Sequence, residues 1–206
     1  MHPVYEPHED SYLLLKYVPK YARGDVLDMG TGSGIIAVEA AKYAKTVLAV
    51  DVNPYAVAYV HERSQHAKNL TVKHSDLFKN IAGKFDAIFF NPPYLPNDPR
   101  VNDLALDGGK HGYEVIDEFL LYAREHLNKK GVIILLFSSL SKPEHIHNTL
   151  KTNGYKYEPV SSLKLDFEEL YVYEIREQGI PGQRQKRSRV QSALERKGSG
   201  SKRKKP

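Results

Sequence analysis

A short strand that runs through a glycine-rich turn into a helix limits this chain to a small set of folds. The apolar run at residues 25–29 predicts the strand, and residues 35–41 predict the helix. Gly30, Gly32 and Gly34 lie between them and allow the backbone to approach a ligand closely. This arrangement is typical of nucleotide-binding α/β folds. The spacing differs from the G-x-G-x-x-G of dinucleotide sites and from the G-K-S/T of a P-loop, so it favours a ligand without a pyrophosphate.

The rest of the chain alternates apolar strands with amphipathic helices. We expect helices near residues 10–17, 35–41, 54–67, 113–127 and 142–153, the first of them ending near Pro19. We expect strands at residues 25–29, 46–50, 70–74, 85–90, 131–137, 155–163 and 169–175. Helices between the early strands favour parallel pairing, whereas the last two strands predict an antiparallel pair. The sequence therefore predicts an α/β fold with a Rossmann-like, seven-stranded, mostly parallel sheet and helices on both faces.

Three aspartates lie at the carboxyl ends of expected strands. Asp28 directly precedes the glycine turn. Asp51 follows that turn by about 20 residues, which is the position of a carboxylate that accepts both hydroxyls of a ribose. Asp51 could instead cap the next helix, although Asn53 competes for that role. Asp76 follows the third strand and suits the amino group of an adenine. Because parallel strands end at one edge of a sheet, we expect these acids to form a nucleoside site.

The tetrad Asn91-Pro92-Pro93-Tyr94 ends a buried strand. The Asn91 side chain and the Pro92 backbone each offer a carbonyl acceptor, and together they can hold both N–H bonds of a planar amino or amide group. Gripping both hydrogens orients the nitrogen and localises its lone pair, and Tyr94 can stack on the planar group. The same residues could also form a simple turn after a core strand. Residues 95–112 form a long polar loop beside the tetrad, and we expect it to be a wall of the substrate site.

The charge of the chain is divided unevenly. The formal net charge is +5, but residues 179–206 contain ten Lys or Arg and one Glu, which leaves residues 1–178 with a net charge of −4. The terminal segment has a composition typical of disorder. It predicts a solubilising tail, a tether to nucleic acid or the ribosome, or a linker-like remnant. We therefore expect one functional domain at residues 1–176, followed by a basic tail at residues 177–206.

Metal, disulfide and membrane functions find little support in the sequence. The chain has no cysteine and its nine histidines do not cluster. The pairs His145-x-His147 and His61-x4-His66 are read as surface residues, so we expect no metal site. Its apolar runs are shorter than the ~20 residues of a membrane span. The first residues do not form a signal peptide, and we expect a cytoplasmic protein.

The combination of these motifs resembles the class I S-adenosylmethionine-dependent methyltransferases, and the resemblance covers residues 1–176. Within that class, Asn-Pro-Pro-Tyr is shared by enzymes that methylate planar nitrogens. The opening stretch Val4–Leu14, Val-Tyr-Glu-Pro-His-Glu-Asp-Ser-Tyr-Leu-Leu, is similar to the start of the short HemK-type glutamine methyltransferases of archaea and eukaryotes. The loop that begins Asp107-Gly108-Gly109 is similar to a downstream loop of the same subfamily.

This resemblance implies a role for each matching residue. S-adenosyl-L-methionine would be the cofactor, covered by the N-terminal segment at residues 1–20 and bound by Ser11, Asp28, Gly30, Gly32, Asp51, Asp76, Leu77 and Asn91. Asn91, Pro92 and Tyr94 would hold the substrate amide, and Asp28 stands where human-type sequences carry Glu. The implied substrate is the Gln of the Gly-Gly-Gln loop of a class I release factor. The implied partner is a small zinc-binding activator subunit, for which the strand at residues 70–74 is the expected edge.

Other functions remain open at this point. An N6-adenine methyltransferase of DNA or RNA would share the tetrad and could use the basic tail, but the acidic body and the absence of a target-recognition domain speak against it. Cytosine-N4 and guanine-N2 methylation belong to the same group. A protein-lysine methyltransferase is a further option, although a lysine amine is not planar. A binding module with an inactive site is the remaining alternative, and cofactor binding without turnover would identify it.

Overall fold

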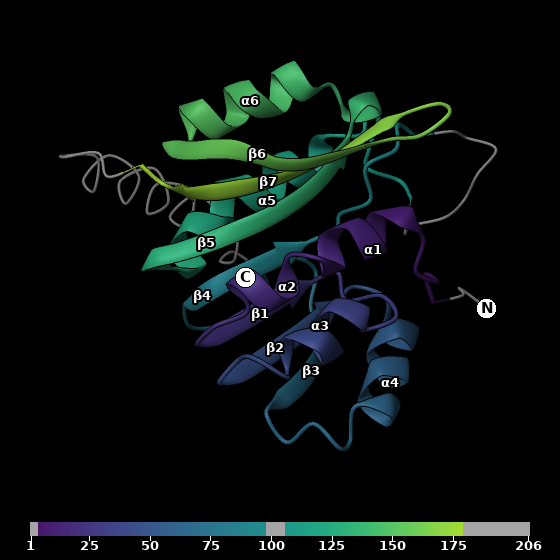
Figure 1. The fold of residues 1–206 in the computed structure, drawn as a ribbon, viewed down its shortest axis with the longest axis vertical. Coiled ribbons are helices and arrows are strands. Elements are labelled where there is room, and N and C mark those ends of the chain that lie inside the picture. Colours follow the sequence, from purple (N-terminus) through teal and green to yellow (C-terminus); the bar gives the residue numbers. More distant parts are fainter. Residues whose placement is uncertain (1–3, 98–105, 179–206) are drawn as a thin grey trace, which may run out of the picture.

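The computed structural model describes residues 4–97 and 106–178, and these residues contain one seven-stranded sheet (Figure 1). Its strand order is β3-β2-β1-β4-β5-β7-β6. The first five strands are parallel where they pair, and β7 is antiparallel to both of its neighbours. The strands are β1 (Asp25–Met29), β2 (Thr46–Asp51), β3 (Leu70–His74), β4 (Phe85–Phe90), β5 (Leu127–Ser138), β6 (Tyr155–Lys164) and β7 (Glu169–Glu177). The predicted fold class is confirmed.

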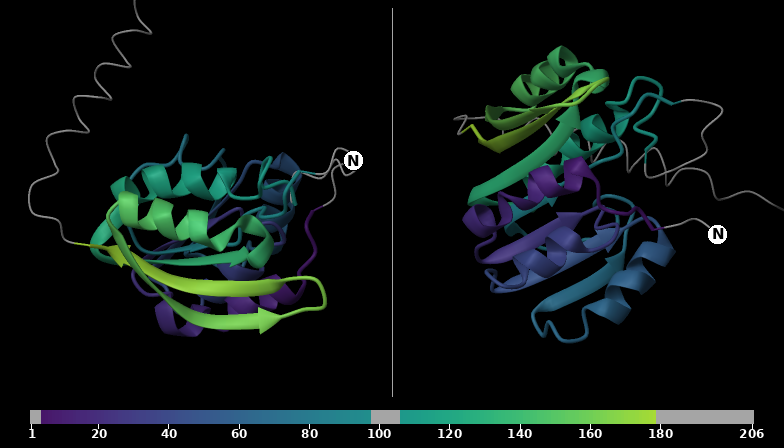
Figure 2. Two further views of the ribbon diagram at one scale, coloured as in Figure 1. Left: turned by 90° about the horizontal axis from the view of Figure 1, so that it is seen from above. Right: turned by 45° about the vertical axis from the view of Figure 1, so that its right-hand side comes forward.

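Helices cover both faces of the sheet (Figure 2). They are α1 (Glu9–Leu15), α2 (Val18–Tyr21), α3 (Ile35–Ala40), α4 (Pro54–Arg63), α5 (Glu114–Ala123) and α6 (Pro143–Thr152), with short 3-10 turns η1 (Arg124–His126) and η2 (Ser139–Ser141). One buried cluster joins α5 and α6 to one face, and a second joins α1, α2 and α3 to the other. Strand β4 shows how this is done, because Ile88 and Phe90 belong to the first cluster while Ala87 and Phe89 belong to the second.

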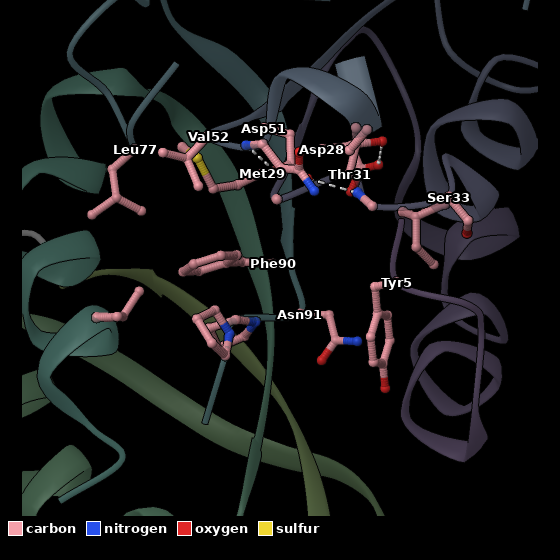
Figure 3. Close-up of a pocket in the computed structure, with 18 of the residues that line it drawn as sticks. Tyr5, Asp28, Met29, Thr31, Ser33, Asp51, Val52, Leu77, Phe90 and Asn91 are labelled. Carbon is pink, nitrogen blue, oxygen red and sulfur yellow. Dashed lines mark hydrogen bonds between the residues drawn. The ribbon is translucent and has the colours of Figure 1, made fainter. Parts of the chain in front are cut away.

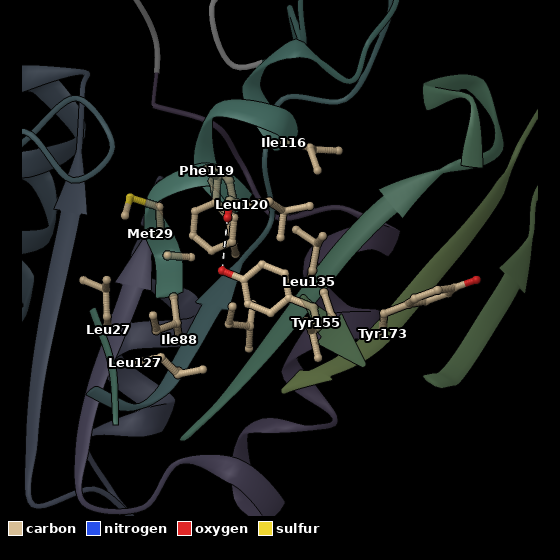
Figure 4. Packing of buried hydrophobic residues seen from close by; sticks show 14 of the residues in the cluster. Leu27, Met29, Ile88, Ile116, Phe119, Leu120, Leu127, Leu135, Tyr155 and Tyr173 are labelled. Atoms are coloured by element: carbon tan, nitrogen blue, oxygen red, sulfur yellow. Dashed lines mark hydrogen bonds between the residues drawn. The ribbon is translucent and has the colours of Figure 1, made fainter. Parts of the chain in front are cut away.

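The core beneath α5 also contains one polar group. Tyr155 at the start of β6 is almost fully buried, and its hydroxyl donates a hydrogen bond of 3.0 Å to the backbone carbonyl of Leu120 (Figure 4). Because the phenol finds this partner, a large aromatic ring can be buried without leaving its oxygen unsatisfied. The contact fixes α5 against the far end of the sheet.

Three of the differences between the observed and the predicted element boundaries have a clear physical reason. Helix α4 ends at Arg63, because the buried Ser64 takes the C-terminal position and a turn follows it. Leu127 begins β5 and does not end a helix, because it pairs with Phe85 of β4. Pro19 lies in the first turn of α2, where its missing N–H is harmless, and therefore does not mark the end of the helical region.

Parallel pairing brings four strand ends to one edge of the sheet. In the register of the sheet, Met29 pairs with both Val50 and Phe90, and Asp51 pairs with His74. The segments that follow β1, β2, β3 and β4 therefore emerge side by side. None of the helices within residues 4–97 and 106–178 is long and apolar enough to cross a membrane.

Candidate active site

A cavity of about 420 Å³ lies at the edge where these four strands end (Figure 3). The ten residues singled out by the sequence all line it: Ser11, Asp28, Gly30, Gly32, Asp51, Asp76, Leu77, Asn91, Pro92 and Tyr94. Residues that are far apart in the sequence are thus brought to one concave site. The structure brings the predicted set together, and the roles of its members remain to be tested.

The glycine turn forms one wall of the cavity. Its backbone is fixed to the sheet, because Thr31 donates its N–H to the carbonyl of Val50 at 2.9 Å. Gly34 is the N-cap residue of α3 with a φ of +81°, and a Cβ added there would lie 2.8 Å from Cγ2 of Val60 in α4. Both the backbone angle and the close approach therefore require glycine. Glycine at position 34 therefore allows the turn to pass between the cavity and α4.

Two carboxylates lie behind the turn in different environments. Asp28 is buried, accepts a hydrogen bond of 2.6 Å from the Thr31 hydroxyl, and has its pKa raised to about 7, mainly by burial. Asp51 accepts backbone N–H bonds of 2.8 Å from Gly32 and Asn53. Burial also raises the pKa of Asp51, and these N–H bonds oppose that effect. The helix cap is Asn53, which accepts the N–H of Tyr55, so Asp51 is left free of that role.

The opposite side of the cavity is largely apolar. Val52, Leu77 and Phe90 face the interior in Figure 3 and offer apolar surface to a planar ring. Leu77 has a φ of +43°, a conformation that side chains rarely adopt, and its carbonyl accepts the hydroxyl of Ser75 at 2.7 Å. Asp76 stands beside it and forms an ion pair of 2.5 Å with Lys79. An acid, a strained residue and an aromatic ring thus surround one end of the cavity.

The tetrad closes the other end, directly after β4. The side-chain nitrogen of Asn91 donates a hydrogen bond of 2.9 Å to Asp10 of α1. The side-chain oxygen of Asn91 is buried and has no partner, which is found at no other buried side-chain nitrogen or oxygen in the described part of the chain. Burial, followed by the charges of Asp10 and Glu168, raises the pKa of Tyr94, so its phenol stays neutral. The tetrad therefore presents a dry acceptor and an uncharged ring.

The loop after the tetrad packs on the tetrad backbone. Its glycine at Gly112 has a φ of +81°, and a Cβ placed there would lie 2.5 Å from the carbonyl oxygen of Tyr94. The carboxylate of Asp107 holds the loop by accepting the N–H of Gly109 at 2.9 Å. Leu95, Leu106 and Asp107 of this loop line the cavity, whereas residues 98–105 of the same loop lie outside the described residues. Its role as a wall of the substrate site stays a prediction.

Several residues of the cavity wall were not predicted from the sequence. The residue pattern places Asp10 in a helix start and Tyr5 in an irregular segment, without a role in the site. The structure joins them, because the Tyr5 hydroxyl donates to the Asp10 carboxylate at 2.9 Å. Thr31 and Phe90 also line the cavity without having been predicted there. The sequence carried no signal for Asp10, because an acid in the first turn of a helix is ordinary and its burial is seen only in the structure.

Known proteins resemble this chain along most of its length. The family described as methyltransferase small domain matches residues 6–158. A protein of Methanocaldococcus jannaschii to which protein N5-glutamine methyltransferase activity is ascribed is 45% identical, with 84% of this chain and 91% of the relative covered. Methyltransferase HEMK2 of Mus musculus is 32% identical, with 73% of this chain and 79% of the relative covered.

A solved structure provides the third comparison. The Mtq2–Trm112 complex of E. cuniculi, described as responsible for methylation of the eRF1 translation termination factor, matches with a TM-score of 0.70 at 28% identity. The match covers 86% of this chain and 99% of the other. Family, relatives and fold all agree with the site geometry. This chain belongs to the methyltransferase small domain family and, within it, to the short HemK-type glutamine methyltransferases.

Proposed function

We propose that this methyltransferase transfers a methyl group from S-adenosyl-L-methionine to the side-chain amide of the Gln in the Gly-Gly-Gln loop of a class I translation release factor. The observation that carries the proposal is the buried, unpartnered side-chain oxygen of Asn91 beside the cavity. An unsatisfied buried acceptor is costly in a folded protein, on the order of 1 to 3 kcal/mol, and calls for a donor. A substrate N–H would supply that donor.

The other end of the cavity fits the proposed cofactor. Asp51 would accept the ribose hydroxyls, and Asp76 with Leu77 would border the adenine. Asp28, Gly30, Gly32 and Ser11 would surround the charged amino-acid portion. When bound, the cofactor supplies a methyl group that is already activated by its sulfonium, with a neutral leaving group. The protein's own contribution is then to position the acceptor and to exclude water.

Asn91 and Pro92 would hold the acceptor nitrogen, with Tyr94 stacked on the amide plane. The oxygen of Asn91 is closed to solvent, so an incoming amide must displace part of the covering wall to reach it. Holding both N–H bonds there orients the nitrogen lone pair toward the methyl group. A planar amide suits this grip better than a tetrahedral lysine amine does.

We further propose that a small zinc-binding activator subunit pairs with β3. This strand ends the sheet with β2 on one side, and Leu70 and Val72 are only half buried along it. An edge strand offers free backbone groups for strand addition. Nucleic-acid or ribosome contact by the basic tail remains a separate proposal, because residues 179–206 lie outside the described residues.

Transfer of a labelled methyl group tests the proposed function. The protein would be incubated with labelled cofactor and a release factor, the same factor with its loop Gln changed to Ala, duplex DNA or ribosomal RNA. Each reaction would be run with and without the activator subunit. We expect label on the unaltered release factor only. Label on nucleic acid, or equal label on the Gln→Ala factor, would contradict the proposed substrate.

A further inference from the structure

The buried carboxylate of Asp10 sets the orientation of the Asn91 side-chain amide. The Asp10 side chain is 3% exposed, lies in the first turn of α1, and accepts the Asn91 amide nitrogen at 2.9 Å. A carboxylate can only accept hydrogen bonds. Turning the Asn91 amide by 180° would place its oxygen against a carboxylate oxygen, where the two acceptors would repel each other. Figure 3 shows the resulting orientation, with the amide nitrogen toward Tyr5 and the oxygen directed away from it.

Asp10 is itself held in place by donors of its own segment. One carboxylate oxygen accepts the Tyr5 hydroxyl at 2.9 Å, and the other accepts the N–H and the hydroxyl of Ser11. The carboxylate is therefore fixed by three donors before Asn91 is considered. Its remaining capacity is directed at the amide nitrogen of the tetrad, which comes from a strand 81 residues away.

We propose that Asp10 is a positioning residue. It keeps the side-chain oxygen of Asn91 available to accept a hydrogen bond from the N–H of the substrate amide. The inference rests on the proposed function, because it gives that oxygen its use. Without the carboxylate, the amide could rotate and present its NH2 group to the substrate. The NH2 group of Asn91 and the NH2 group of the substrate amide would then face each other as two hydrogen-bond donors. The substrate nitrogen would lose its orientation.

The test is an exchange of the two side chains. In Asp10→Asn, the Ser11 N–H keeps the oxygen of the new amide in place, so the new NH2 group faces Asn91 and favours the flipped amide. We expect kcat to fall about 100-fold, as for a misplaced reacting group, with little change in cofactor affinity. In Asn91→Asp, two carboxylates face each other, and activity should also fall.

The double variant Asp10→Asn with Asn91→Asp restores the pairing in reverse. The amide introduced at position 10 can donate to the carboxylate introduced at position 91, whose other oxygen again faces the substrate. We expect the double variant to be about tenfold more active than either single variant, as for two groups in direct contact. Glu9→Gln is the matched control, because it removes one exposed charge from the same helical turn. Its kcat should stay at the level of the unaltered enzyme.

A measurement on the unaltered protein covers variants that fail to fold. The side-chain NH2 signals of Asn91, assigned by triple-resonance NMR on the unaltered protein, should include one proton that exchanges slowly with water because it is bonded to Asp10. Rapid exchange of both protons would overturn the proposal, as would full kcat in a folded Asp10→Asn variant or a double variant no better than the singles. If no release factor is methylated, the proposed function fails while this amide measurement still decides the role of Asp10.

Discussion

The side-chain carboxyl group of Asp28 lies in a buried environment where its ionised form is poorly solvated. It is buried at the end of β1, and the neighbouring charge of Asp51 disfavours its ionisation further. The Thr31 hydroxyl offsets part of this cost by donating a hydrogen bond at 2.6 Å. The balance raises the pKa of Asp28 from 3.8 to about 7. The acid therefore changes its charge close to neutral pH in the ligand-free protein.

This shift predicts a pH dependence of stability. Between the unfolded pKa of 3.8 and the folded pKa of about 7, the folded protein holds a proton that the unfolded chain has lost. Stability therefore falls as pH rises through this window and levels off above it, by on the order of 4 kcal/mol at most. Urea unfolding at pH 5 and pH 8 should show a smaller difference for Asp28→Asn than for the unaltered protein. An equal difference in both proteins would contradict the assignment.

Substitutions of Asn91 and of Asp51 should impair different properties, turnover in the first case and cofactor binding in the second. Asn91→Ala removes the acceptor for the substrate and should lower kcat at least about 100-fold, with cofactor affinity nearly unchanged. Asp51→Ala removes the proposed ribose contact and should weaken cofactor binding about tenfold or more. Calorimetry with the cofactor and turnover assays would be applied to both variants. Unchanged affinity in Asp51→Ala would refute the ribose role, and full turnover in Asn91→Ala would refute the amide role.

The part of the site that could be predicted consists of residues whose position follows from the local sequence pattern. Asp51, Asp76 and Asn91 lie at the ends of strands expected from the sequence, and parallel topology then brings them together. The bond from Asn91 to Asp10 could not be predicted in this way, because it joins a strand end to a helix 81 residues earlier. The strained backbone at Leu77 also leaves no mark in the residue pattern.

At the scale of elements, the loop at residues 106–112 supports the tetrad from behind. Its backbone lies so close to the Tyr94 carbonyl that no Cβ fits at Gly112. The hydroxyl of Ser141 in η2 donates to the same carbonyl at 2.9 Å. Two segments that follow β4 in the sequence thus set the position of Tyr94. The length of the loop predicted a wall for the substrate, but its contact with the tetrad backbone was not predictable.

Gly112→Ala should therefore impair catalysis more than folding. The new Cβ would meet the Tyr94 carbonyl and shift the tetrad, so we expect kcat to fall about tenfold or more, as a small misplacement of reacting groups can cause. Gly83→Ala is the matched control, because Gly83 also has a positive φ of +91° but has no atoms near an added Cβ. That control should lose about 1 kcal/mol of stability and keep its kcat. Equal kcat values in the two variants would show that the contact does not matter.

At the scale of the whole molecule, the boundaries of β1 to β4 matched the predicted ones to within one residue. Strand β5 begins at Leu127 and not at the predicted residue 131, because Leu127 pairs with Phe85. The helix boundaries matched less well, since tertiary contacts decided them at Ser64 and Leu127. That helices cover both faces of the sheet was predicted, but the sequence did not assign each helix to a face. The domain boundary near residue 176 and the tail remain predictions.

The proposed partner surface predicts a local change in hydrogen exchange. Within residues 70–74, the backbone amides that do not bond to β2 should exchange quickly in the isolated protein and become protected when the activator subunit is added. Residues 155–164 of the other edge strand, β6, serve as an internal control and should not change. Protection in β6 alone would place the partner at the other edge of the sheet. Protection in neither strand would exclude pairing of the partner with an edge strand.

The two edges of the sheet also differ in their capacity for growth. Strand β6 carries Pro159 and an irregular register next to it, whereas β3 has no proline. Proline cannot donate to a further strand, so addition is hindered at one edge and open at the other. A molecule whose sheet is open to strand addition at one edge can form dimers through that edge. It cannot extend into filaments, because no second open edge is left to bind a further molecule. An excess of this chain over its partner should therefore end in dimers and not in fibres.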